Sequence, residues 1–201
     1  TSMSWGWILG WAMPALAWGA LEGVVINRTT GEPQPGVIVS LFEAGAGELK
    51  PLATARTSND GGFRFEQQSS GPSVVQALYQ GVVYSQMAPA PGSGQKLELV
   101  VYEATDDVST VRLAQHLILL EPINENLHVS ESLVFQNAGD RALRSARQLA
   151  RFYVPRERSG EPRVSVTSPQ GVAVERPLLP LEQPDVYGVD YPLRPGETRV
   201  D

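Results

Sequence analysis

The side chains best suited to acid–base or metal chemistry in this 201-residue chain are its two histidines, His116 and His128. They lie in two separate apolar segments, and neither belongs to an HExxH spacing. A zinc site needs three or four convergent ligands. The chain also has no cysteine, which removes thiolate metal sites, cysteine nucleophiles and disulfides. The pattern therefore predicts no metal site and favours histidines that are hydrogen-bonded or at the surface.

Other catalytic signatures are missing from the sequence. No serine lies in a GxSxG motif, and there is neither a phosphate-binding loop nor a dinucleotide fingerprint. We therefore expect a protein that is not an enzyme and that binds no cofactor. The net charge of −6 argues against nucleic acid as a partner, since such proteins present a basic surface.

Positive charge gathers between residues 140 and 163, where seven arginines and three acidic residues give 7 − 3 = +4. The segment Asp140–Arg151 has an Asp suited to capping a helix and no β-branched residue, so local propensity favours a helix. A β-sandwich would place a strand or connection there, and both alternatives stay open. The candidate interaction surface, for an acidic partner or an anionic lipid surface, consists of Arg141, Arg144, Arg147, Arg151, Arg156 and Arg158. A solvated face with scattered ion pairs is the alternative.

Short strands separated by Gly- and Pro-containing turns fill the first half of the chain. An apolar run over residues 21–26 ends at Asn27, and two glycines and two prolines follow within residues 30–36. Alternation in residues 37–42 places Val37, Val39 and Leu41 on one strand face. Residues 59–62, Asn-Asp-Gly-Gly, predict a hairpin turn from residues 56–58 into Phe63–Phe65, whose two aromatic rings are expected to anchor a core.

Further strands are expected at residues 74–79 and 82–84, joined by a tight turn or a bulge at Gln80 and Gly81. The last one, residues 96–102, places Leu97, Leu99 and Val101 on one face. The total of about seven strands between residues 21 and 102 fits a small β-sandwich.

The stretch from Gly23 to Phe65, GVVINRTTGEPQPGVIVSLFE followed by TARTSNDGGFRFE, resembles the carboxypeptidase regulatory-like (transthyretin-like, prealbumin-like) β-sandwich family. The resemblance covers residues 21–102 and implies that fold there. Hydroxyisourate hydrolases of the family use histidines and a C-terminal Tyr-Arg-Gly-Ser, which this chain does not show. The resemblance thus implies the non-enzymatic branch, whose modules sit beside peptidases, receptors or adhesion domains in exported bacterial proteins.

The second half also has strand-like patterns. Residues 111–120 and 127–137 alternate with period two, with a bulge expected near Ser132. Further strand candidates are residues 163–167, 171–174 and 186–191. The last residues, 195–201, indicate a turn and the start of a strand. We expect an Ig-like β-sandwich that is cut before its last strand.

Residues 5–20, WGWILGWAMPALAWGA, form an uncharged apolar stretch that is short for a membrane span. Ala15, Leu16 and Ala17 match the small-x-small pattern of a signal-peptide cleavage site. The stretch predicts export, as a cleaved signal or as a short apolar helix retained as an anchor. A buried N-terminal core segment is the alternative.

Together these patterns predict an all-β chain of two consecutive β-sandwich domains, transthyretin-like over residues 20–104 and Ig-like over residues 105–201, after a signal-like segment at 1–19. The expected function is a non-enzymatic structural or protein–protein interaction module of the bacterial cell envelope, periplasmic or extracellular. The alternatives are a carbohydrate- or peptide-binding module and an accessory domain of a peptidase. Expected partners are envelope proteins, and membrane association stays open.

Overall fold

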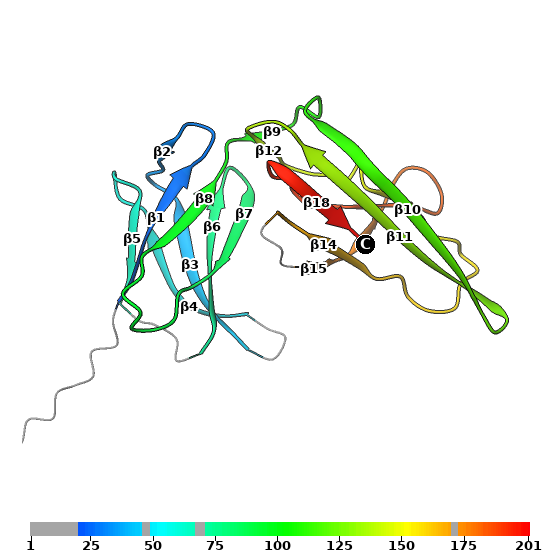
Figure 1. The fold of residues 1–201 in the computed structure, drawn as a ribbon, viewed down its shortest axis with the longest axis horizontal. Coiled ribbons are helices and arrows are strands. Elements are labelled where there is room, and N and C mark those ends of the chain that lie inside the picture. The colour runs from blue at the N-terminus through cyan, green and yellow to red at the C-terminus, as the bar shows by residue number, and fades with distance from the viewer. Residues whose placement is uncertain (1–19, 46–48, 67–70, 170–172) are drawn as a thin grey trace, which may run out of the picture.

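The computed structural model describes residues 20–45, 49–66, 71–169 and 173–201, and all regular structure in them is β-strand. The all-β prediction is therefore confirmed (Figure 1). None of the described residues belongs to a helix that could cross a membrane. The predicted signal segment, residues 1–19 with its short apolar helix, lies outside the described residues.

Two sheets make up the first half of the chain. In one, β1 lies between β5 and β8, parallel to β8, and β2 pairs with the end of β1. The other has the order β4-β3-β6-β7 and is antiparallel. The strands are β1 Leu21–Asn27, β2 Glu32–Pro33, β3 Ile38–Ala44, β4 Leu49–Arg56, β5 Gly62–Phe65, β6 Ser73–Tyr79, β7 Val82–Met87 and β8 Leu97–Val101.

A single hydrophobic cluster, the first core, lies between these two sheets. The predicted inward faces are confirmed, because all eight of their side chains are buried in this cluster: Val37, Val39, Leu41, Phe63, Phe65, Leu97, Leu99 and Val101. The Phe63 and Phe65 rings pack with their centroids 5.6 Å apart. Alternation in the sequence was sufficient to identify these eight side chains, because one face of each strand is buried.

The turn at residues 59–62 forms, but the predicted hairpin is wrong. Ser58 N–H donates to the Gly62 carbonyl at 2.9 Å, and Gly61 adopts φ 73°. However, β4 pairs with β3 while β5 pairs with β1, so the turn connects two different sheets. The reason is that the turn itself binds β1: Val25 N–H donates to the Gly61 carbonyl at 2.9 Å. At Gln80 and Gly81, by contrast, both residues have positive φ and join β6 to β7 as a tight two-residue turn, as one alternative predicted.

The second half contains a five-stranded sheet of order β10-β11-β18-β14-β15 and a three-stranded sheet of order β13-β17-β16. They enclose a separate cluster, the second core, which includes Leu133, Phe135, Val166 and Val189. The sequence analysis missed β13 and β16. The strands are β10 Val111–Ile123, β11 Asn126–Asn137, β13 Arg151–Tyr153, β14 Val164–Thr167, β15 Ala173–Arg176, β16 Leu178–Pro180, β17 Val186–Val189 and β18 Gly196–Val200.

A helix over residues 140–151 is the wrong alternative. Ala142 and Leu143 form β12, which pairs in parallel with β9 (Ala104–Thr105), and only a single turn follows at residues 146–150. The N–H groups of Ala142, Leu143 and Ala146 donate to the carbonyls of Glu103, Leu193 and Tyr191. Because these N–H groups already have distant acceptors, they are not available for i−4 helical bonds.

The predicted bulge near Ser132 is also misplaced. The register of β10 and β11 shifts between Leu113 and Gln115, so the extra residue, Ala114, belongs to β10 and lies opposite Val134 and Phe135. The strand β11 itself continues without interruption.

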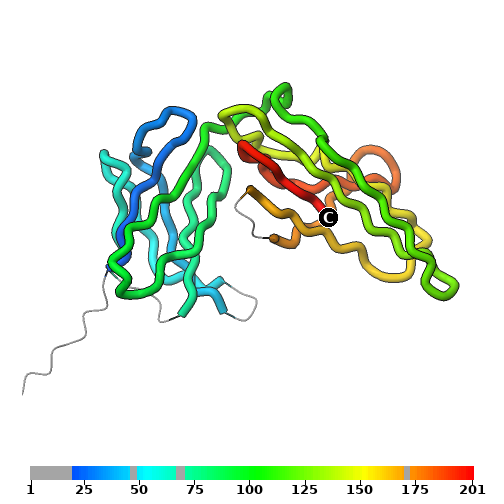
Figure 2. Tube along the Cα trace, viewed as in Figure 1, coloured from blue at the N-terminus to red at the C-terminus, as the bar shows by residue number. Residues whose placement is uncertain are grey.

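The two halves touch close to the connecting segment, which lies at the top of the view in Figure 2. Thr29 Oγ1 donates to the Asp140 carbonyl at 2.6 Å. The largely buried Arg194 donates to the Val83 carbonyl at 2.8 Å, and its guanidinium lies 4.8 Å from the centre of the Tyr84 ring. Tyr84 O–H in turn donates to the Tyr102 carbonyl at 3.0 Å.

A substitution at Gly23 tests the packing of the first core. A Cβ there would lie 2.3 Å from Phe63 Cζ and 2.5 Å from the Leu97 carbonyl oxygen. We expect Gly23→Ala to lower the free energy of unfolding by ~2–3 kcal/mol, because backbone and a core ring must shift. Gly31→Ala is the control, since its Cβ meets nothing and only its positive φ costs ~1 kcal/mol. Urea denaturation measures both, and equal losses would contradict the close-packing argument.

Because of Tyr84, the free energy of unfolding should fall as the pH rises in the alkaline range. Burial raises the pKa of Tyr84 to about 12, so the folded chain holds the phenol proton more tightly than the unfolded chain. Its contribution is complete below pH ~10 and is lost as the pH rises through about 12. Tyr84→Phe should cost ~1 kcal/mol at pH 7, because the Tyr102 carbonyl loses its donor, and should flatten the decline between these two pH values. Denaturation curves with the same alkaline slope in both proteins would exclude this role.

Candidate interaction site

The two histidines lie in one hairpin but on opposite faces of it. His116 stands opposite Leu133, and His128 stands opposite Glu121, in rows that point to different sides. His116 Nε2 lies 2.6 Å from Glu131 Oε1. The histidines therefore cannot bind one ion together. Nowhere in the described residues do three or more His, Asp or Glu side chains come together as a metal site.

The arginines of the predicted surface do not share a helical face, and five of them bond to other parts of the chain. Arg144 pairs with Asp106 at 2.5 Å, and Arg158 lies 3.5 Å from Glu161. Three others bond to residues 180–185: Arg147 to the Pro180 carbonyl, Arg151 to Gln183 and Arg156 to Asp185. Arg141 is exposed. Three of the five bonded arginines thus hold residues 180–185 in place, and partner binding by this surface stays a prediction.

Tyr79, Tyr84 and Tyr102 do not form an aromatic platform for a ligand. Tyr84 is buried in the first core, and its ring centroid lies 6.4 Å from that of Tyr102. Tyr79 O–H donates to Glu103 at 3.0 Å, in a cluster that includes Asn27. Hydrogen bonds from Tyr79 and Gln80 lower the pKa of Glu103, and the Arg141 charge acts in the same direction. These polar groups close the end of the first core near the connection between the two halves.

The most unusual surface of the described chain is the outer part of the β10–β11 hairpin, residues 117–132, which we call the arm. It projects beyond the second core at the right of Figure 1. Two residues, Asn124 and Glu125, form its tip, where Asn124 adopts φ 55°. At its base, β11 enters the second core through Leu133 and Phe135, which are both buried.

The register assigns each arm residue to one of two faces. The core face continues the direction of Leu133 and carries five apolar side chains: Ile118, Leu120, Pro122, Leu127 and Val129. The outer face has Leu117, Leu119 and Ile123 on β10, opposite Ser132, Ser130 and Asn126 on β11. Thus β10 is apolar on both faces, whereas β11 is apolar on one.

These apolar side chains are exposed to solvent. Leu119, Leu120 and Leu127 have 50%, 55% and 58% of their surface exposed, and the whole arm except its base lacks cover. Contiguous apolar surface of this kind marks interaction sites in soluble proteins. The arm is also an edge, because β10 pairs only with β11 among the described strands.

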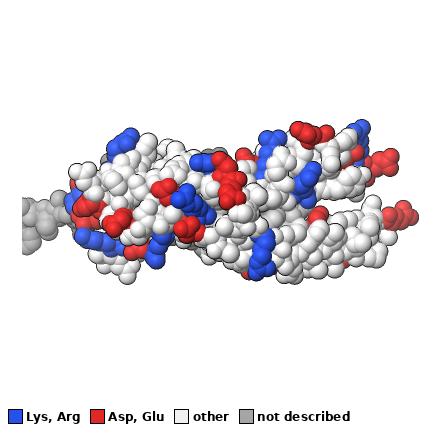
Figure 3. Space-filling view, turned by 90° about the horizontal axis from the view of Figure 1, so that it is seen from above, with Lys and Arg blue, Asp and Glu red and all other residues white. Residues whose placement is uncertain are grey.

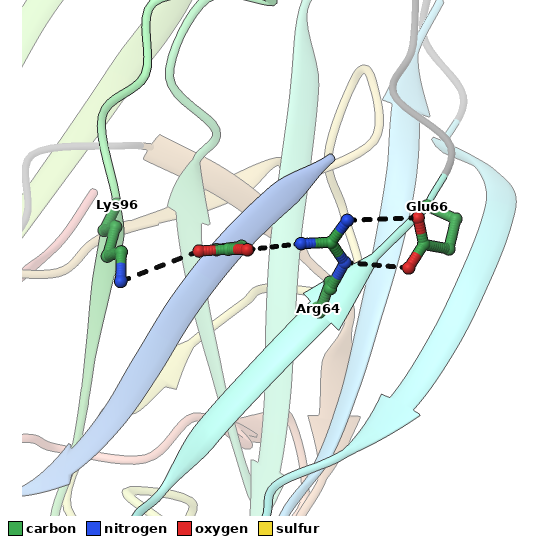
Figure 4. Close-up of polar contacts among 4 residues, drawn as sticks. Arg64, Glu66 and Lys96 are labelled. Atoms are coloured by element: carbon green, nitrogen blue, oxygen red, sulfur yellow. Dashed lines mark hydrogen bonds and ion pairs between the residues drawn. The ribbon is translucent and has the colours of Figure 1, made fainter. Parts of the chain in front are cut away.

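One other solvent-facing strand surface carries charge instead. On β1 and β5, Glu22 and Arg64 lie opposite each other, and they form one ionic row with Glu66 and Lys96 (Figure 4). The Glu66 hydrogen bond and the Glu22 hydrogen bond raise the pKa of Arg64. At the right-hand end of the space-filling view, the lobe that reaches farthest to the right is by contrast largely uncharged up to acidic groups at its end, whereas the lobe above it carries both signs of charge (Figure 3).

All fixed charges of the arm are negative. They are Glu121, Glu125 and Glu131, and residues 117–132 contain no Lys or Arg. An acidic tip is repelled by anionic lipid surfaces, which attract basic segments. The charge of the arm therefore does not favour an anionic lipid surface.

Sequence reasoning found both strands of the arm but not their exposure. The available signal was the unbroken run Leu117–Leu120, beside the strict alternation of β11. Continuous apolar runs are typical of strands that are buried on both faces. In the structure that run lies in an edge strand and is about half exposed. Only the tertiary contacts show that this composition and this position do not match.

Comparison with known proteins identifies no family for this chain. No protein-family model matches the chain. No curated protein matches it either.

Asn137, at the end of β11, should be essential for anchoring the arm. Its buried Nδ2 donates to the Arg141 and Leu193 carbonyls at 2.8 and 3.0 Å, and its Oδ1 accepts from Gly139 N–H and Thr110 O–H. We expect Asn137→Ala to lower the unfolding free energy by ~2–3 kcal/mol, because buried carbonyls lose their donor. Ser130→Ala, exposed on the same strand, should change it by less than ~0.5 kcal/mol. Similar losses in both variants, measured by chemical denaturation, would refute this assignment.

Proposed function

We propose that this chain is a non-enzymatic, exported protein-interaction module made of two consecutive β-sandwiches, and that the arm is its binding element. The single observation that carries the proposal is the arm, where eight apolar side chains lie on a projecting hairpin without cover. They are Leu117, Ile118, Leu119, Leu120, Pro122, Ile123, Leu127 and Val129.

The division into two domains is supported by the two separate cores. The first core collects side chains from β1 to β9, and the second collects those from β10 onward. One exception is Ala142, which packs in the first core beside the connecting segment. We place the domain boundary at residues 104–105, where β9 pairs with β12. The second sandwich, proposed as Ig-like, supplies the arm.

Export to the cell envelope is supported by the apolar residues 5–20. The absence of cysteine from the sequence suits either compartment. In that setting the arm binds an apolar surface of an envelope protein. The arginine surface has a secondary place in this proposal, because five of its six side chains already bond within the chain.

Arm-dependent association tests the function. The chain, carrying a photo-reactive group at Asn126 beside the tip, is incubated with envelope extract and cross-linked. We expect adducts with the wild type and at least a tenfold loss for the pair Leu120→Glu and Leu127→Glu, because each introduced charge must be desolvated on binding. Arg151→Ala is the control and should keep the adducts. Adducts that are unchanged in the arm variant, or absent throughout, would rule out the arm as the binding element.

A further inference from the structure

The two strands of the arm differ in polarity in a way that indicates what covers them. On β11, Leu127 and Val129 alternate with His128 and Ser130, as expected of a strand with one solvated face. On β10, residues 117–120 are apolar on both faces. Strands of that composition are normally covered on both faces, and β10 is in addition an unpaired edge of the described sheet that can pair with another strand. The free edge of β10 is thus the side that should receive another strand.

The charges that flank this run on β10 indicate which strand it receives. Arg112 stands opposite Gln136, and Glu121 stands opposite His128, so both charges point to the outer face. Both are exposed, and neither takes part in an ion pair within the described residues. Because Ala114 is an extra residue in the ladder, Arg112 and Glu121 lie the same number of ladder positions from Leu117. Two β10 strands that run antiparallel about Leu117 would bring each Arg112 beside the other Glu121.

We propose that the arm binds a second copy of this chain, with the two β10 strands paired antiparallel across a two-fold axis at Leu117. This proposal rests on the interaction function proposed above and names its partner. The two five-stranded sheets become one continuous sheet, and each edge loses its unpaired N–H and C=O groups.

The same arrangement covers the apolar side chains of the arm. Antiparallel pairing places the tip of each arm beside the base of the other β10, next to the second core of that copy. The core-face residues Ile118, Leu120 and Leu127 then lie where the three-stranded sheet of the other copy can pack over them. Pro122, which has no N–H, limits the shared ladder to the residues before it.

The first experiment is a cysteine cross-link, which is clean because the chain has no cysteine. Leu117→Cys places a thiol on the two-fold axis, whereas the control Ser132→Cys lies directly opposite on β11, away from the edge. Both positions are outside the cores, so both variants should fold, which circular dichroism checks. We expect a covalent dimer from Leu117→Cys under mild oxidation and at least tenfold less from Ser132→Cys. Equal cross-linking of the two variants would overturn the proposed axis.

The second experiment swaps the charges and measures the dissociation constant of the dimer by light scattering or native mass spectrometry. Arg112→Glu alone and Glu121→Arg alone should each weaken the dimer about tenfold, because two symmetric contacts become repulsive. The double variant should return to within about threefold of the wild type, since opposite charges meet again. Additive losses in the double variant would contradict antiparallel self-pairing.

Two outcomes would reject the second copy as partner. The first is a wild-type chain that stays monomeric up to about 100 μM, a concentration at which even a weak specific pair associates. If the envelope cross-links still need the arm in that case, the interaction function stands and the partner is a different protein. The other is a monomer that binds phosphatidylglycerol vesicles through the arm, which would make lipid the partner.

Discussion

The continuity of β11 is the constraint on which the second half of this protein depends. One strand runs without a bulge from the exposed tip of the arm to the buried Asn137, with Leu133 and Phe135 fixed in the second core. Its partner β10 accommodates the extra residue, Ala114, at the base. A hairpin alone is at best marginally stable in water. The arm can therefore extend from the protein only because the buried part of the same strand is held by β18 and by the core.

Competition for backbone hydrogen bonds explains the largest correction to the sequence-based expectations. Residues 140–151 have the composition of a helix, yet four of their N–H groups bond to the carbonyls of Glu103, Thr105, Tyr191 and Leu193. Each of these acceptors is distant in sequence, so no local pattern could reveal them. These hydrogen bonds also affect the predicted arginine surface. The segment ties the connection at β9 to the second core, and it separates arginines that a helix would have aligned.

The arm and the charged row on β1 and β5 differ in the side chains that they present to solvent. Glu22, Arg64, Glu66 and Lys96 cover their strands with opposed charges that need no partner. The arm has acidic groups only at its tip and base and leaves its middle apolar. Exposed apolar edges invite association and are usually blocked by charge or proline. Here Pro122, which has no N–H, blocks only the end of the edge.

The sequence by itself determined the strands whose alternation marks one buried face, such as those of Val39, Phe63 and Leu99, because a period of two requires only local information. It also located the interruption at Gln80 and Gly81, and the two-residue turn found there is one of the two alternatives that the sequence left open. Tertiary structure decided which strands pair, so that β4 and β5 entered different sheets. It also decided which apolar residues remain uncovered. Burial depends on what lies opposite a strand, and Leu119 and Leu41 belong to equally apolar runs although one is half exposed and the other is buried.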